Sequence, residues 1–406
     1  MKEGLMRGLF AERIGGQNFD RAGGYKMEAI KAAKRRFQAE HPDRVLLDMG
    51  IGEPDLPPPD FVIEELCSQA HFSENQGYAD NGCPEFREAA ARFMQKTFGV
   101  TVDPQRELVH CIGAKSALSL LPLCLINPGD LVIATHPGYP IFNTHVEYLG
   151  GEIFSLPLLW EQQFLPDLSS IPTDVARKAK VFHVNYPNNP TSAPATSTFF
   201  AELIEFARHY DIAIINDAAY ACLTEHPLSV LQCPHSKDIA IEIHSMSKTY
   251  NMTGWRLGWV CGNADLVSAF SKVKNYSDSG QFLAIQKAAI RALDDGTFSQ
   301  KMTQRYQQRK QSVAAILRTH GFKIHTSDSG CFLYVRVPEK LRHQEQEIPI
   351  TSSAALSQWL LEELGIVSVP WEDPEPSIRF SMTFRCISEK EFYEQLADRF
   401  EGINFF

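Results

Sequence analysis

The sequence contains no apolar run close to the roughly 20 residues that a membrane-spanning helix needs. Its nine cysteines are scattered singly and form no C-x-x-C pair. The odd count and this spacing argue against a disulfide framework or a zinc cluster. Residues 1–21 mix charges and carry no apolar signal segment. We therefore expect a cytoplasmic protein that binds neither a membrane nor a metal.

Positive charge is also scarce, and internal repeats and low-complexity stretches are missing. The chain has 39 Lys and Arg against 49 Asp and Glu, a net charge of −10, which disfavours nucleic acid as a partner. Its 44% apolar and 22% charged residues are ordinary for a globular enzyme. At 406 residues the chain exceeds one typical core, so we expect two domains.

Apolar runs of strand length alternate with helical patterns from about residue 56 to residue 287. This alternation predicts an α/β domain in which helices cover both sides of a large, mostly parallel sheet. The remaining residues, 288–406, predict a smaller α+β domain. Its expected elements are helices over 305–317 and 354–364 and strands over 332–337 and 378–382.

The most specific pattern places an amine, two hydroxyls and a guanidinium after the apolar run 239–244. These groups belong to Lys248, to Ser245 and Ser247, and to Arg256. An amine forms Schiff bases with carbonyl compounds, and pyridoxal phosphate (PLP) is the common carbonyl cofactor. Hydroxyls and an arginine fork suit its phosphate. A solvated surface lysine is the alternative, but the length of the pattern favours a cofactor lysine.

Two upstream apolar runs also end in polar residues. One run leads to Asn189, and the other to Asp217 and Tyr220. Ligands bind at the carboxyl ends of strands in such sheets. A buried carboxylate beside a pyridine nitrogen would keep it protonated and make the ring an electron sink, while Asn and Tyr donors would stabilise its phenolate. Taken singly, Asp217 could equally cap a strand and Asn189 could equally form a turn.

Together these residues resemble the fold-type I, PLP-dependent aminotransferases of class I/II. The resemblance begins near residue 20, and within the class it is most similar to the LL-diaminopimelate aminotransferase branch. It implies a large PLP-binding domain over 56–287, a small domain over 288–406, and an N-terminal arm over 1–55 that packs partly with the small domain. The matching motifs are Gly50–Asp55, Asn189–Thr191, Asp217–Tyr220, Ser245–Lys248 with Arg256, and Ser377–Ser381.

The resemblance also assigns residues to the cofactor. It places Ala114 and Lys115 on the turn that contacts the phosphate, where an ordinary helix start is the alternative. It implies that Tyr139 stacks on the pyridine ring, where a turn-packing tyrosine is the alternative. Tyr78 matches the tyrosine that reaches the phosphate of the neighbouring subunit's cofactor. A homodimer with shared active sites is therefore implied.

Substrate contacts follow in the same way. Arg379 matches the arginine that binds the substrate α-carboxylate, for which its planar fork is suited. Gly52 would let the backbone approach that carboxylate, and Asn189 would lie beside it. Tyr25 resembles a lid residue over the substrate.

The implied reaction is transamination, in which Lys248 holds PLP and then moves a proton from the substrate Cα. The resemblance implies LL-diaminopimelate as the amino donor and 2-oxoglutarate as the acceptor, in lysine biosynthesis.

Three departures from the family pattern keep other reactions open. Ser192 stands where the family usually has Gly, and Gly23–Gly24 replaces a more rigid pair that often precedes the lid tyrosine. The segment 367–376 is shorter and more acidic than the Gly-rich loop of the diaminopimelate branch. These leave transamination of another amino acid, or a PLP-dependent elimination or cyclisation, as alternatives. Residues 372–375 either pair with a distal ammonium of the donor or form a solvated loop.

Overall fold

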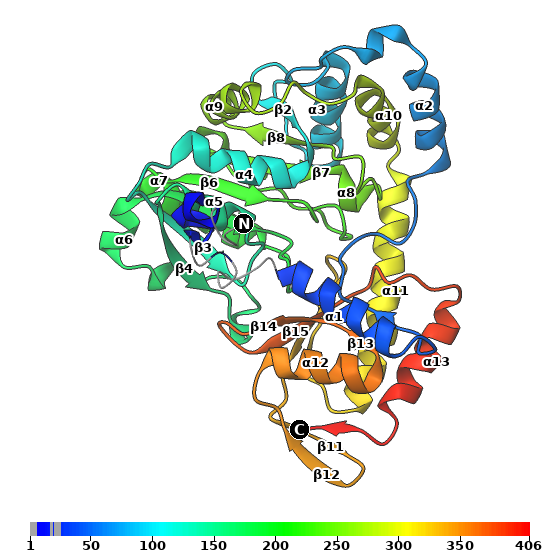
Figure 1. Cartoon of the computed structure of the whole chain (residues 1–406). Helices are drawn as coiled ribbons and strands as arrows, with labels where there is room; N and C mark the ends of the chain where they lie inside the picture. Colours follow the sequence, from blue (N-terminus) through cyan, green and yellow to red (C-terminus); the bar gives the residue numbers. More distant parts are fainter. Residues whose placement is uncertain (1–5, 17–18, 20–25) are drawn as a thin grey trace.

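A seven-stranded sheet lies at the centre of the larger part of the molecule (Figure 1). The structure, a computed structural model, describes residues 6–16, 19 and 26–406. Strand β8 is antiparallel to both of its neighbours, and the other neighbouring pairs are parallel. In spatial order the strands are β2 (Leu108–Cys111), β8 (Gly258–Gly262), β7 (Ala240–Ser245), β6 (Ala213–Asp217), β5 (Ala179–Asn185), β3 (Leu131–His136) and β4 (Glu152–Pro157).

Both faces of this sheet are buried, because the central strands carry apolar residues at successive positions. Val181 packs into the core on one face and Phe182 into the core on the other, and Ile215 and Ile214 divide in the same way. One core includes residues of α2 (Asp60–Ala70), α3 (Pro84–Phe98), α6 (Thr173–Lys178), α7 (Ser197–His209) and α10 (Leu283–Asp294). The other includes residues of α4 (Gly113–Leu125), α5 (Ile141–Tyr148) and α9 (Ala264–Asn275).

The smaller part is built on a four-stranded antiparallel sheet in the order β14 (Val369–Trp371), β15 (Ser377–Ser381), β10 (Phe332–Arg336), β9 (Ile324–His325). Its apolar core also contains Leu47 and Met49, so the segment that precedes the large sheet packs with the C-terminal part. The remaining elements here are α1 (Lys26–Glu40), β1 (Leu47–Asp48), β11 (Lys340–His343), β12 (Gln346–Pro349), α12 (Ser353–Leu364), β13 (Ile366–Val367), α13 (Glu389–Phe400) and β16 (Asn404–Phe405).

One long helix, α11 (Thr297–Thr319), runs from the larger part into the smaller one (Figure 1). It begins earlier than the predicted start at residue 305. The reason is Asp295, whose carboxylate accepts hydrogen bonds from the backbone N–H groups of Thr297 and Phe298, each at 3.2 Å. Such an acceptor satisfies N–H groups that have no partner within the helix.

Arg309 on α11 ties distant segments together from a fully buried position. Its guanidinium contacts Asp55 at 3.0 Å and Glu389 at 2.9 Å, and it donates to the carbonyl oxygen of Met382 at 2.7 Å. It also lies 4.2 Å from the ring centre of Phe384. The N-terminal segment, α11 and the C-terminal strands are therefore joined at one side chain.

Helix α10 crosses the predicted domain boundary at residue 287 and packs against α2 and α3 of the larger part. None of the helices in the described ranges is long and apolar enough to cross a membrane. In the same ranges, no group of three or more His, Cys, Asp or Glu side chains is arranged to hold a metal ion.

Candidate active site

A cleft of about 450 Å³ opens at the carboxyl ends of the parallel strands. Strands β6 and β7 end at Asp217 and Ser245, and Asn189 and Tyr139 lie in the loops after β5 and β3. All predicted site residues except Tyr25 and Tyr78 line this cleft, namely Gly52, Ala114, Lys115, Tyr139, Asn189, Asp217, Tyr220, Ser245, Ser247, Lys248, Arg256 and Arg379.

The two exceptions differ from each other. Tyr25, together with Gly23 and Gly24, lies outside the described residues. Tyr78 lies in the loop between the short helical turn Ser73–Gln76 and α3, and it is 87% exposed. Within a single chain its ring therefore faces solvent rather than the cleft.

Asp217 is buried in the floor of the cleft, and burial raises the pKa of its carboxyl to about 7. One backbone N–H, that of Ala219, lies 3.2 Å away and opposes this rise. No Lys, Arg or His side chain of the described chain pairs with this carboxylate. A protonated ring nitrogen would supply the missing positive partner, so this position fits the pyridine of PLP.

Lys248 lies in the short helix α8 (Met246–Thr249), directly after β7. Its Nζ donates a hydrogen bond to the carbonyl oxygen of Gly52. Burial lowers the pKa of the amine, opposed in part by the negative charge of Glu53. A lowered pKa favours the neutral amine, which is the form that attacks a carbonyl carbon.

The groups expected to hold a phosphate lie together at the start of α4. Gly113 has φ +71°, and a Cβ there would lie 2.6 Å from Nη2 of Arg256. Nη1 of Arg256 donates to the carbonyl oxygen of Thr253 at 2.8 Å, which orients the guanidinium. Ser245 and Ser247 line the same cleft. This set of hydroxyls, a guanidinium and a helix N-terminus fits a phosphate.

Arg379 reaches the cleft from β15 of the smaller part and is 5% exposed. Its Nη1 donates to Oδ1 of Asn189 at 2.8 Å, and its Nη2 donates to the carbonyl oxygen of Gly50 at 2.7 Å. The guanidinium also lies 4.3 Å from the ring centre of Phe332. These contacts orient the fork before any substrate arrives.

Phe332 is a cleft residue that sequence reasoning missed. Its ring contacts that of Tyr220 at 5.4 Å between centres, and a Cβ on Gly52 would lie 2.8 Å from the same ring. Gly52 is therefore required by Phe332, in addition to any approach of a substrate. Nothing in the sequence marks this phenylalanine, because it belongs to an ordinary apolar strand.

Ser192, one of the departures from the family pattern, supports Phe332. Its φ of +59° lies in the left-handed region that favours glycine. Its Oγ accepts a hydrogen bond from the backbone N–H of Phe332 at 2.9 Å. The serine hydroxyl thus joins the large sheet to β10 beside the cleft, where a glycine could make no such bond.

None of the acidic residues in the segment before Arg379 lines the cleft, and Glu372 and Asp373 are exposed. Part of it forms β14. Glu372 accepts hydrogen bonds at the start of α12 from Oγ of Ser353 at 2.7 Å and from the N–H of Ala354 at 3.0 Å. Glu375 pairs with Arg336. Residues 372–375 follow β14 as a largely exposed bend, which agrees with the solvated-loop reading, and none of them lines the cleft where a distal ammonium of the donor would bind.

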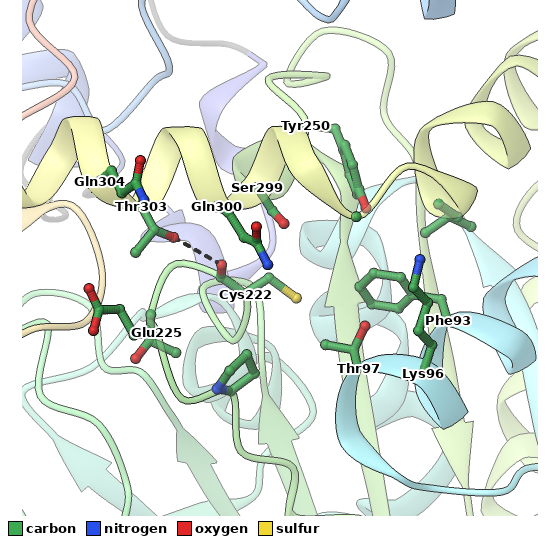
Figure 2. A pocket seen from close by; sticks show the side chains of 14 residues that line it. Phe93, Lys96, Thr97, Cys222, Glu225, Tyr250, Ser299, Gln300, Thr303 and Gln304 are labelled. Carbon is green, nitrogen blue, oxygen red and sulfur yellow. Dashed lines mark hydrogen bonds between the residues drawn. The ribbon is translucent and has the colours of Figure 1, made fainter.

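A second cavity, of about 440 Å³, lies between α3, the loop after β6 and the start of α11 (Figure 2). Cys222 and Gln300 lie between the two charged side chains Glu225 and Lys96 in this view. None of the predicted site residues lines this cavity.

Three comparisons agree with this geometry. The family model for aminotransferases of class I and II matches residues 44–400. A Methanocaldococcus jannaschii protein named LL-diaminopimelate aminotransferase is 43% identical over 386 residues, which cover 94% of this chain and 91% of that protein. A Methanococcus maripaludis protein of the same name is 40% identical, covering 98% and 96%. The substrate-bound structure of BacF from Bacillus subtilis is 28% identical, with a TM-score of 0.88 over 98% of each chain.

Proposed function

This chain belongs to the class I and II aminotransferase family, and from that premise we propose that it transfers an amino group from LL-diaminopimelate to 2-oxoglutarate, as a step of lysine biosynthesis. It is a PLP-dependent aminotransferase. The observation that carries the chemistry is the meeting of Lys248, Asp217 and Arg379 in one cleft. The donor is supported by relatives of that name at about 40% identity over most of the chain.

Each residue of the cleft has a part in the proposed mechanism. Bound PLP supplies the carbonyl that takes up the substrate amino group and the ring that accepts electrons from Cα. Lys248 holds the cofactor at rest, and its freed Nζ then moves a proton from the substrate Cα. Arg379 and Asn189 bind and orient the α-carboxylate, so that one Cα–H bond faces the lysine.

The remaining residues hold the cofactor in this proposal. Asp217 pairs with the ring nitrogen and keeps it protonated, while Tyr220 and Asn189 donate to the ring oxygen. Tyr139 stacks on the ring. The phosphate is bound by Ala114, Lys115, Ser245, Ser247 and Arg256. We also propose that Tyr25 closes over the substrate and that the enzyme acts in the cytoplasm.

The proposal includes a homodimer in which Tyr78 contacts the phosphate in the partner's site. The 87% exposure of Tyr78 in one chain supports it, because an aromatic residue so exposed gains from burial against a second chain. Tyr276 is 91% exposed as well, and it lies three residues before Ser279, whose carbonyl oxygen accepts a hydrogen bond from the N–H of Ala79 at 3.2 Å.

The decisive experiment has two readouts on the purified protein loaded with PLP. Borohydride reduction should fix the cofactor covalently to a peptide that contains Lys248. In single turnovers, LL-diaminopimelate should discharge the cofactor absorbance faster than aspartate, alanine or phenylalanine. Label on another lysine would contradict the site. Inert diaminopimelate with rapid reaction of a different amino acid would contradict the donor and favour one of the alternative PLP reactions.

A further inference from the structure

We propose that Gln281 is a positioning residue for the cofactor phosphate, and that it acts by holding the backbone of Arg256. Gln281 lies between α9 and α10 and is not among the residues that line the cleft. It therefore works through the residue that it contacts. The inference rests on one part of the proposed function, the assignment of Arg256 to the phosphate, and it does not depend on which amino acid is the donor.

The backbone of Arg256 needs support from outside, because its φ of +58° lies in the left-handed region. A residue with a Cβ prefers the other backbone regions to this one by a factor of about 5 to 30. Such a conformation persists where the surrounding structure fixes it, and it is often found at functional sites. A neighbouring group that binds the main chain of Arg256 is therefore expected.

Gln281 provides this support through its side-chain amide. Its Nε2 donates to the carbonyl oxygen of Arg256 at 2.7 Å and also to that of Trp255, so both N–H groups of the amide are used. Its Oε1 lies 3.2 Å from Nε2 of His110. Burial, together with the charge of Lys274, lowers the pKa of His110 to about 4. The neutral ring then donates its proton from Nε2, because an amide oxygen can only accept.

The segment that carries Gln281 is itself held firmly. Lys274 is 1% exposed, and its Nζ donates to Oδ1 of Asp278 at 2.6 Å. The same carboxylate oxygen accepts a hydrogen bond from the N–H of Gly280 at 2.8 Å. The side chain of Gln286 donates to the carbonyl oxygen of Gln281 at 2.9 Å. A group on so fixed a segment can keep a neighbouring residue in a strained conformation.

The backbone of Arg256 in turn decides where its guanidinium lies. Nη1 donates to the carbonyl oxygen of Thr253, and Nη2 lies against Gly113 at the start of α4, so closely that a Cβ there would be 2.6 Å away. A change of the Arg256 backbone would move the guanidinium away from this helix N-terminus. Without Gln281 the conformation that can bind phosphate is less populated, and the apparent Kd rises as that population falls.

The test compares two ligands of the cofactor-free protein, PLP and pyridoxal, which lacks the phosphate. The variant Gln281→Met keeps the size of the side chain and removes both donors. Its Kd for PLP should rise about 5- to 30-fold, which is the preference that Gln281 offsets at Arg256. Its Kd for pyridoxal should change by less than about twofold. Absorbance titration and equilibrium dialysis measure both constants without any turnover.

A double-mutant cycle shows whether Gln281 acts through Arg256. Once Arg256→Met has removed the guanidinium, adding Gln281→Met should change the Kd for PLP by less than about twofold. The matched control is Gln307→Met, because Gln307 is also half-buried and donates from its amide to a backbone carbonyl oxygen, that of Asp328. This variant should bind both ligands as the wild type does. Thermal unfolding of each cofactor-free protein checks that the fold is intact.

The possible failures are distinguishable. An equal rise of Kd for PLP and pyridoxal would overturn the inference, since Gln281 would then support the cleft as a whole. An unchanged Kd for PLP in Gln281→Met, or the full loss repeated in the Arg256→Met background, would overturn it as well. If Arg256→Met alone bound PLP as tightly as the wild type, the proposed phosphate site would fail and this inference with it.

Discussion

At the scale of single residues, the buried carboxylate of Asp217 has no cationic partner among the residues that the structure describes. Burial raises the pKa of this carboxyl to about 7, from its usual value of 3.8. In the cofactor-free protein this raised pKa has a consequence for stability. The native state binds a proton there that the unfolded chain has released, so the stabilisation is complete below about pH 4 and is lost as the pH rises through 7.

We predict that cofactor-free wild-type protein loses stability relative to Asp217→Asn by about 3 kcal/mol between pH 5 and pH 8. Urea unfolding of both proteins at the two pH values measures this difference, and other titrating groups cancel because both proteins share them. Parallel pH dependences in the two proteins would show that the burial of Asp217 does not set its pKa.

The sequence identified the residues whose chemistry is unusual and missed those whose role is packing. Lys248 and Asp217 could be predicted because their side chains are out of place where apolar strands end, whereas Arg379 was assigned through the resemblance to the family. Phe332 and the hydrogen bond of Ser192 could not, since both depend on the approach of a strand that is far away in the chain. The requirement for glycine at position 52 could not be predicted either, because it depends on the ring of Phe332, against which a Cβ would lie.

At the scale of elements, α11 joins the two parts of the molecule by means of a buried cation. Replacing Arg309 with Met would remove the donor of the carbonyl oxygens of Met382 and Phe384. It would also remove one of the two arginines that pair with the buried carboxylate of Asp55. Such a loss costs about 3–5 kcal/mol for a buried ion pair.

We therefore expect Arg309→Met to lower the free energy of unfolding by about 3 kcal/mol or more, measured by urea titration. The control is Arg336→Met. Like Arg309, Arg336 pairs with two carboxylates, but it is about one-third exposed, so its removal should cost less than about 1 kcal/mol. Equal effects of the two replacements would contradict the role of α11 as the link.

Some of the strands could be predicted from the sequence, whereas their pairing with distant strands could not. The buried parallel strands β3, β5, β6 and β7 agree with the sequence-based prediction, because continuous apolar runs mark a strand that is covered on both faces. The antiparallel placement of β8 and the pairing of β1 with β13 could not be predicted. Both are choices among distant partners, which a local pattern does not record.

At the scale of the whole molecule, the proposed sharing of Tyr78 makes each site depend on two chains. Lys248→Ala should be inactive, and Tyr78→Phe should bind PLP more weakly and react more slowly. When the two variants are unfolded together and refolded, each mixed dimer regains one site with both wild-type residues. Activity per chain should therefore rise above the mean of the two variants refolded separately.

Refolding of each variant by itself is the control for this mixture. Size-exclusion chromatography should show the dimer in every sample. A mixture whose activity is the mean of its parts would contradict shared sites, although a dimer without sharing would remain possible.

Arg379, which contacts Asn189 and Gly50 in the cleft, is synthesised after the residues assigned to the cofactor. The groups assigned to the cofactor ring and phosphate within one chain lie between residues 114 and 256, so the ribosome has delivered them long before it reaches Arg379. Strand β15 must then insert between β14 and β10 to bring that arginine to the cleft. A nascent chain can thus acquire the means to hold its cofactor well before it can select an amino acid.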